Sequence, residues 1–244
     1  MISVTDVHKS FDGIAVLQGV TVSLEESELT ALIGRSGSGK SVLLRHMSGM
    51  MHPDRGSVQV DGHELSALSG RQVRLLRTRF GFVFQGGALF DSMTVYDNVA
   101  FPLRERKKMK ESDIEEQVSR ALAQVGLSGS ERKLPAQISG GMVKRTALAR
   151  TLVMKPEIIF FDEPTTGLDP ITGGAILRLI DQTHRQAGFT GVIVTHQIPR
   201  VFDIVGKVAL LHEGTIRFYG TPEALQASDD EVVRSILTGE DESS

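Results

Sequence analysis

A glycine-rich stretch carries the clearest chemical signal in the sequence. Residues 34–41 read Gly-Arg-Ser-Gly-Ser-Gly-Lys-Ser and fit the phosphate-binding pattern G-x-x-x-x-G-K-[ST], the P-loop. The glycines let the backbone curl so that successive N–H groups face one point, where an anion can bind. We expect the Lys40 ammonium to reach the β- and γ-phosphates of a nucleotide and the Ser41 hydroxyl to hold Mg²⁺.

The segments on either side of the P-loop supply the context that the motif needs. Residues 29–33 form an apolar run that predicts a buried strand, and residues 41–50 predict a helix, whose N-terminus adds roughly half a positive charge at the loop. A chance glycine-rich turn is the alternative, but the order of strand, loop and helix favours nucleotide binding. The residues assigned to the nucleotide here are Gly34, Arg35, Ser36, Gly37, Ser38, Gly39, Lys40, Ser41 and Val42.

Two acidic residues close a second apolar run. Residues 158–161 are apolar and are followed by Asp162 and Glu163. A continuous apolar run is typical of a strand buried on both faces, and the ligands of open parallel sheets gather at the carboxyl ends of strands. An aspartate there suits Mg²⁺, and an adjacent glutamate suits activation of water. Two acids that merely face solvent are the alternative, which the P-loop upstream disfavours.

Three further side chains are candidates for the same site. Gln85 follows the apolar strand run 81–84 and could ligate Mg²⁺ and orient water, although alone it is a weak signal. A lone histidine is usually structural, but His196 stands at the end of the predicted strand 191–195, where the strands of the site should converge. Phe11 lies in a predicted turn and could stack on a nucleobase; taken alone, packing within a hairpin is favoured.

A serine and two glycines precede a predicted helix over residues 142–153. Ser139 is a good N-cap, and Ser139, Gly140 and Gly141 form either a simple cap or a second anion-binding helix N-terminus. Upstream, residues 112–115 fit a capping box for a helix that ends before Gly126.

Composition limits the classes of function. The chain has 244 residues, 40% hydrophobic and 23% charged, which fits an ordinary globular protein with one core, or one core with a lobe. The net charge of −3 gives no global basic field for nucleic acid, so we expect no nucleic-acid partner. The absence of cysteine excludes disulfides, thiol catalysis and a thiolate zinc site. The sequence has neither a secretory signal pattern nor an apolar run of about 18–20 residues, so we expect a cytosolic protein that needs a partner at any membrane.

Predicted strands alternate with predicted helices along most of the chain, which indicates an α/β fold with a mainly parallel sheet. Residues 71–79 predict a helix with a solvated basic face; contact with lipid phosphates or a partner is the alternative. Residues 86–102 include Phe90 and Met93 and form either the core of a small lobe or a docking surface for another protein.

These motifs, in this order, resemble the ATP-binding subunit of an ABC transporter over about residues 2–238. Ser139-Gly140-Gly141 resembles the signature that separates this family from other P-loop proteins. The resemblance implies a single ATPase domain over residues 1–238. Its parts would be a RecA-like P-loop NTPase core, an N-terminal antiparallel β subdomain and an inserted α-helical subdomain at about residues 86–155. Residues 239–244 are expected to be a disordered acidic tail.

The resemblance also implies roles for single residues, with ATP and Mg²⁺ as ligands. Glu163 would act as general base or orient the attacking water, Asp162 would hold Mg²⁺, and His196 would contact the γ-phosphate. Phe11 would stack on adenine, which reverses its interpretation as a packing residue. Ser139, Gly140 and Gly141 would complete the ATP site of a second copy, so a homodimer is expected. The catalytic set is Glu163, His196, Gln85 and Lys40, and the metal set is Ser41, Gln85 and Asp162.

One departure from the family pattern narrows the resemblance further. Met142 stands where the signature usually has glutamine, which removes a polar group near the ribose. The signature with Met142, together with the sequences of residues 84–90 and 95–105, resembles the ATPases of MCE/Mla-type bacterial phospholipid transporters. That resemblance implies a membrane permease, an MCE-type substrate-binding subunit and a small STAS-domain protein, on the cytoplasmic side of the inner membrane. An importer or exporter of another substrate, or a soluble ABC ATPase acting on DNA or the ribosome, is the alternative.

Overall fold

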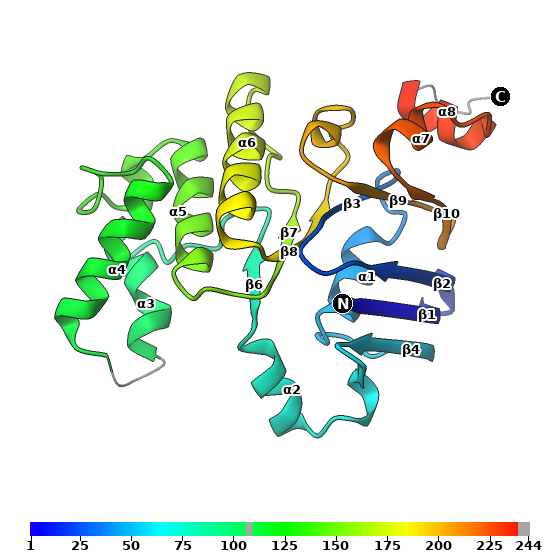
Figure 1. The fold of residues 1–244 in the computed structure, drawn as a ribbon, viewed down its shortest axis with the longest axis horizontal. Coiled ribbons are helices and arrows are strands. Elements are labelled where there is room, and N and C mark those ends of the chain that lie inside the picture. The colour runs from blue at the N-terminus through cyan, green and yellow to red at the C-terminus, as the bar shows by residue number, and fades with distance from the viewer. Residues whose placement is uncertain (106–108, 239–244) are drawn as a thin grey trace.

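The computed structural model describes residues 1–105 and 109–238, and its strands form two sheets (Figure 1). The predicted acidic tail, residues 239–244, lies outside the described residues. The larger sheet has the order β10-β9-β3-β8-β7-β6. Its strands are β3 (Leu29–Ile33), β6 (Phe80–Val83), β7 (Ile158–Asp162), β8 (Thr190–Val194), β9 (Lys207–His212) and β10 (Thr215–Gly220). Only β10 runs antiparallel to its neighbour in this described sheet, which confirms the expected mainly parallel α/β fold.

The smaller sheet is antiparallel and has the order β2-β1-β4-β5. Its strands are β1 (Ile2–Phe11), β2 (Ile14–Leu24), β4 (Arg55–Val60) and β5 (His63–Glu64). Phe11 is the last residue of β1 and not a turn residue as predicted, because β1 pairs with β2 up to Phe11 and Ile14 and only residues 12–13 form the turn.

Helices cover the larger sheet and extend from it on the β6 side (Figure 1). They are α1 (Lys40–Met47), α2 (Gly70–Arg77), α3 (Val95–Glu105), α4 (Glu111–Gln124), α5 (Gly140–Leu152), α6 (Pro170–Ala187), α7 (Pro222–Gln226) and α8 (Glu231–Thr238), with short 3₁₀ turns at Leu65–Ala67, Pro135–Gln137 and Arg200–Asp203. Helices α3, α4 and α5 lie together and come from the segment between β6 and β7. The helical subdomain predicted at about residues 86–155 covers these helices, and its standing as a separate unit stays a prediction.

Several predicted helix boundaries differ from the structure: the helices predicted at residues 142–153 and 71–79 are Gly140–Leu152 and Gly70–Arg77, and two further differences have a clear cause. The capping box over residues 112–115 is wrong: α4 begins at Glu111 after Lys110, which makes no side-chain cap. Glu111 instead accepts a hydrogen bond from Arg104 and, in the first turn, complements the positive helix end. The P-loop helix ends at Met47 and not at residue 50, since Gly49 adopts the left-handed φ of 65° that follows many helix ends.

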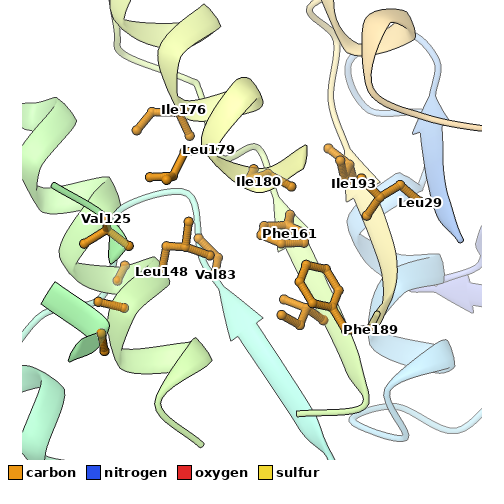
Figure 2. Close-up of a cluster of buried hydrophobic side chains, with 14 of the residues drawn as sticks. Leu29, Val83, Val125, Leu148, Phe161, Ile176, Leu179, Ile180, Phe189 and Ile193 are labelled. Atoms are coloured by element: carbon orange, nitrogen blue, oxygen red, sulfur yellow. The ribbon is translucent and has the colours of Figure 1, made fainter. Parts of the chain in front are cut away.

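The central strands of the larger sheet, β3, β7 and β8, are buried on both faces, whereas the edge strand β10 is partly exposed. Successive strand residues point to opposite faces, so Phe160 and Phe161 enter different apolar clusters. Phe161 packs with Ile193, Ile180 and Phe189, beneath α6 (Figure 2). Phe160 belongs to the cluster that also contains Leu32 of β3 and side chains of α1 and the smaller sheet. Because both faces are covered, chemistry is left to the strand ends and the loops that follow them.

Candidate functional site

A pocket of about 500 Å³ opens at the carboxyl ends of β3, β6, β7 and β8. It brings together five segments that are far apart in the sequence. Its lining residues are Phe11, Val16, Ser36, Gly37, Gly39, Lys40, Ser41, Val42, Gln85, Glu163 and His196.

Strand register explains why these side chains meet. Asp162 of β7 pairs with Val194 of β8, which in turn pairs with Leu32 of β3. The residues that follow these positions therefore leave the sheet at one edge. This edge is where the sequence placed the P-loop, the two acids and the histidine.

The P-loop is shaped by contacts that exclude larger residues. Gly34 has a φ of 151°, and a Cβ there would lie 2.3 Å from the carbonyl oxygen of Leu211. Gly39 has a left-handed φ of 99° and would place a Cβ 3.1 Å from side-chain atoms of Val16 and Leu17. Only glycine lets the loop pass so close to its neighbours before α1 begins.

The Lys40 ammonium lies within the P-loop. Its side chain donates hydrogen bonds to the carbonyl oxygens of Gly34 at 2.9 Å and Arg35 at 2.8 Å, and the residue is 7% exposed. Burial lowers the pKa of Lys40, and the carboxylates of Glu163 and Asp162 oppose this shift. Nearby, the buried Ser38 hydroxyl has no hydrogen-bond partner among the described residues. The loop thus offers a charge and a free polar group to an anion.

Oxygen donors gather beside the loop. The Ser41 hydroxyl donates to Asp162 Oδ1 at 3.0 Å, and Gln85 lines the same pocket. Hydroxyl, carboxylate and amide oxygens are the ligands that Mg²⁺ prefers. The three residues predicted for the metal therefore have the right chemistry, and two of them are in contact.

Glu163 and His196 form a pair at the pocket. His196 Nδ1 lies 2.9 Å from Glu163 Oε1, and because a carboxylate only accepts, Nδ1 carries the hydrogen. Thr166 donates to Glu163 Oε2 at 3.0 Å. Glu163 also holds a left-handed φ of 50°, rare for a non-glycine residue, while its backbone N–H donates to Val194. The Glu163 side chain is 13% exposed and that of His196 54%, so the carboxylate is fixed and sheltered whereas the imidazole faces outward.

Phe11 is exposed at the rim of the pocket. The Lys9 ammonium lies 5.6 Å from the centre of its ring. An exposed ring beside a phosphate-binding loop is available for stacking. Its contact with a base stays a prediction.

Ser139, Gly140 and Gly141 lie outside the pocket, at the start of α5. Ser139 is the N-cap, as predicted, and its hydroxyl accepts from the Met142 N–H at 3.3 Å. Ser139 and Gly140 are exposed, whereas Gly141 is buried and a Cβ on it would lie 2.7 Å from Thr172 Cγ2. The structure therefore separates the predicted binding residues into a pocket and an exposed helix end.

Comparison with known proteins decides the family. Residues 17–166 match the ABC transporter family. The chain belongs to the ABC transporter family. Together with the pocket, this confirms the expected ATP-binding domain and identifies ATP as the P-loop ligand of this family.

Curated relatives and solved structures agree with that assignment. The chain is 43% identical over 238 residues to the probable ribonucleotide transport ATP-binding protein mkl of Mycobacterium tuberculosis. The match covers 98% of this chain and 66% of that relative, just under two thirds of its length. Identity to the intermembrane phospholipid transport ATP-binding protein MlaF of Escherichia coli is 37%, over 98% of this chain and 89% of MlaF. The dimeric ATP-binding cassette MJ0796 bound to ADP and Pi superposes with a TM-score of 0.81 at 30% identity, over 91% and 99% of the two chains.

Three contacts of this ABC transporter chain were missed by the sequence reasoning. Thr166 holds Glu163, and Lys144 and Arg150 of α5 donate to backbone carbonyls around Gln85. A threonine three residues after the acid is a local signal that could have been used. The α5 contacts join segments about sixty residues apart, so only the fold reveals them.

Within the part of the chain that the structure describes, every helix is too short or too polar to span a lipid bilayer.

Proposed function

We propose that the chain is the ATP-hydrolysing subunit of an ABC transporter and works as a head-to-tail homodimer. The observation that carries this proposal is the pocket that unites the P-loop with Gln85, Glu163 and His196, while the Ser139 end of α5 remains exposed. The dimeric cassette with ADP and Pi supports the same assembly. Residues 1–238 would be one ATPase domain with a helical subdomain at about residues 86–155.

The pocket residues fit a nucleotide and Mg²⁺. The P-loop N–H groups, the Lys40 ammonium and the N-terminus of α1 would bind the phosphates, and Phe11 would stack on adenine. Ser41, Asp162 and Gln85 would hold Mg²⁺ through oxygen. The metal, when bound, supplies charge neutralisation at the phosphates.

Glu163 and His196 would act on the γ-phosphate and the attacking water. Thr166 and His196 fix the Glu163 carboxylate, whose remaining lone pairs can accept a hydrogen bond from water and orient it. His196 Nδ1 donates to Glu163, so a contact with the γ-phosphate would be made through Nε2, which must also carry a hydrogen to donate to a phosphate oxygen. Phosphoryl transfer needs positioning and charge neutralisation more than covalent chemistry, and the site supplies both.

The second half of the site would come from the partner copy. Ser139, Gly140 and Gly141 precede the first turn of α5, where helix N–H groups lack intrahelical acceptors and the dipole favours an anion. They would contact the γ-phosphate bound by the other chain. Met142 replaces the usual glutamine but leaves these groups in place.

We further propose that the transporter moves phospholipid. The name of MlaF and the Met142 signature support this cargo. By the same reasoning the partners would be a membrane permease, an MCE-type substrate-binding subunit and a small STAS-domain protein, on the cytoplasmic side of the bacterial inner membrane. The permease would dock at residues 86–102, where Phe90 is exposed and packs on Phe101 with ring centres 4.8 Å apart.

A second cargo is supported by another relative. The mkl protein is named for ribonucleotide transport. Purification of the native membrane complex through a tag on this chain, followed by mass spectrometry of its subunits and bound small molecules, separates the cases. A permease with bound phospholipid supports the proposal, and a permease with a bound ribonucleotide other than ATP or ADP but no lipid supports the alternative. Recovery of the chain with ribosomes or DNA and no permease would overturn both.

A further inference from the structure

Three side chains of α5 donate to the backbone around Gln85. Lys144 Nζ donates to the carbonyl oxygen of Gln85, and Thr151 Oγ1 donates to that of Phe82 at 2.9 Å. Beyond Gln85, Arg150 donates to the carbonyl oxygens of Gly87 at 2.7 Å and Ala88 at 2.6 Å. Lys144 and Thr151 are seven residues apart, which places them on one face of the helix. We call Lys144, Arg150 and Thr151 the α5 clamp.

The backbone held by the α5 clamp is irregular and needs such support. Gly87 and Ala88 both have left-handed φ values, of 74° and 47°. A Cβ on Gly87 would lie 2.9 Å from Val143 Cγ1, so the loop lies directly against α5. Beyond β6 the carbonyls of this loop have no strand partner among the described residues, and charged donors make the stronger hydrogen bonds. The clamp therefore sets where the loop lies.

Lys144 is the member of the clamp closest to the proposed chemistry. It is 6% exposed, and a buried ammonium is retained only where it has partners. Burial lowers the pKa of Lys144, and the carboxylate of Glu163 opposes this shift. The Lys144 ammonium thus donates to the carbonyl oxygen of Gln85 and is attracted by the carboxylate of Glu163. Its neighbour Arg145 instead donates to Val125 at the end of α4, at 3.1 Å.

We propose that Lys144 is a positioning residue that fixes Gln85 at the pocket and ties its position to α5. This inference rests on the proposed function, in which Ser139 at the N-terminus of α5 binds the partner's nucleotide. A shift of α5 when the dimer closes would then move Gln85 through Lys144. Within one chain, Lys144 would link the Ser139 end of α5, which serves the partner's nucleotide, to Gln85, which serves the chain's own nucleotide.

Lys144→Met tests this link, with Arg145→Met as the matched control from the same helix. In the full-length chain, Lys144→Met should lower kcat for ATP about tenfold while KM changes less than twofold, because substrate binding by the P-loop is untouched. Lys144→Arg should restore kcat to within about twofold, and Arg145→Met should stay within the same range. Hydrogen exchange at the Gly87 amide, which donates to Phe84, should become roughly tenfold faster in Lys144→Met alone.

Unchanged exchange at Gly87 in Lys144→Met would overturn the inference, as would an equal loss of kcat in Arg145→Met. Should Lys144→Met fail to fold, Lys144→Gln replaces it: the side chain is one bond shorter and neutral, so Gly87 exchange should still rise, and wild-type exchange would count against the link. Exchange does not depend on turnover. Absence of hydrolysis by the wild type would therefore overturn the proposed function without deciding the role of Lys144.

Discussion

Two helix N-termini in this chain are offered to phosphate, and they are built differently. Helix α1 begins after the buried Gly39 in left-handed backbone, and its first residue, Lys40, is 7% exposed. Helix α5 begins after the exposed Ser139 in extended backbone, with a side-chain cap. The first is embedded in a pocket with acids and a histidine, whereas the second lies outside that pocket. One chain therefore contains a formed half-site and an open one, which is the arrangement a head-to-tail dimer requires.

The two helix N-termini also differ in the hydrogen bonds that fix their side chains. At the pocket end, Glu163 contacts both Thr166 and His196, and Lys40 is bound by loop carbonyls. At the α5 end, the Ser139 hydroxyl accepts a hydrogen bond from the Met142 N–H of its own helix. We therefore expect the pocket to bind ATP within one chain, and the α5 end to act only when a nucleotide on another chain reaches it. Substitutions at the two ends should separate binding from hydrolysis.

The largest effect is expected at the pocket acid. Glu163→Gln keeps the size of the side chain but removes the charge that orients water, so kcat should fall roughly 10²- to 10⁴-fold. ATP binding should persist, and an ATP-bound dimer should accumulate in size-exclusion chromatography. Glu157→Gln is the control, since Glu157 precedes the opposite end of β7 and pairs with Arg79. Normal turnover in Glu163→Gln would remove Glu163 from the reaction.

A smaller effect with a different signature is expected at the α5 end. Ser139→Arg places bulk and charge where the partner's γ-phosphate should lie, so hydrolysis should fall about a hundredfold. Binding of ATP by the monomer, measured by calorimetry, should remain within about twofold, because Ser139 does not line the pocket. Lys40→Ala should instead abolish binding itself. Loss of monomer binding in Ser139→Arg would place the two ends in one site and contradict the comparison.

The sequence predicted which residues meet at the pocket better than it predicted helix boundaries and the contacts between distant segments around the pocket. The bounds 29–33 for β3 were confirmed because that strand is a continuous buried run, and the convergence of Glu163 and His196 followed from the geometry of parallel strands. The start of α4 was wrong because an ion pair with Arg104 competes with a local capping pattern. Lys144 escaped notice because its partner is 59 residues away, and periodicity carries no information on such contacts.

The smallest expected effect is a loss of stability in acid, caused by the buried His46 of α1, the helix that follows the P-loop. His46 of α1 is 0% exposed, and its Nδ1 donates to the carbonyl oxygen of Val42 at 2.7 Å. Burial lowers the pKa of His46; the hydrogen bond to Val42 and the charge of Asp54 oppose this shift, and Lys9 adds to it. As the pH falls below about 6.5, the unfolded chain therefore binds a proton at His46 more readily than the folded chain does. The free energy of unfolding should then rise with pH through this window and fall as the solution is acidified.

Urea unfolding at pH 7.5 and 5.5 measures the contribution of His46 to the pH dependence of the free energy of unfolding. The wild type should lose more stability between the two values than His46→Gln, by up to about 1 kcal/mol, because Gln keeps an N–H donor but does not titrate. His52→Gln is the control, because His52 is exposed and near in sequence; it should follow the wild type. If the free energy of unfolding changes equally with pH in the wild type and in His46→Gln, the folded chain does not disfavour protonation of His46. A larger loss in the wild type than in His46→Gln would show that the buried His46 of α1, the helix that carries Lys40 and Ser41, contributes to the loss of stability in acid.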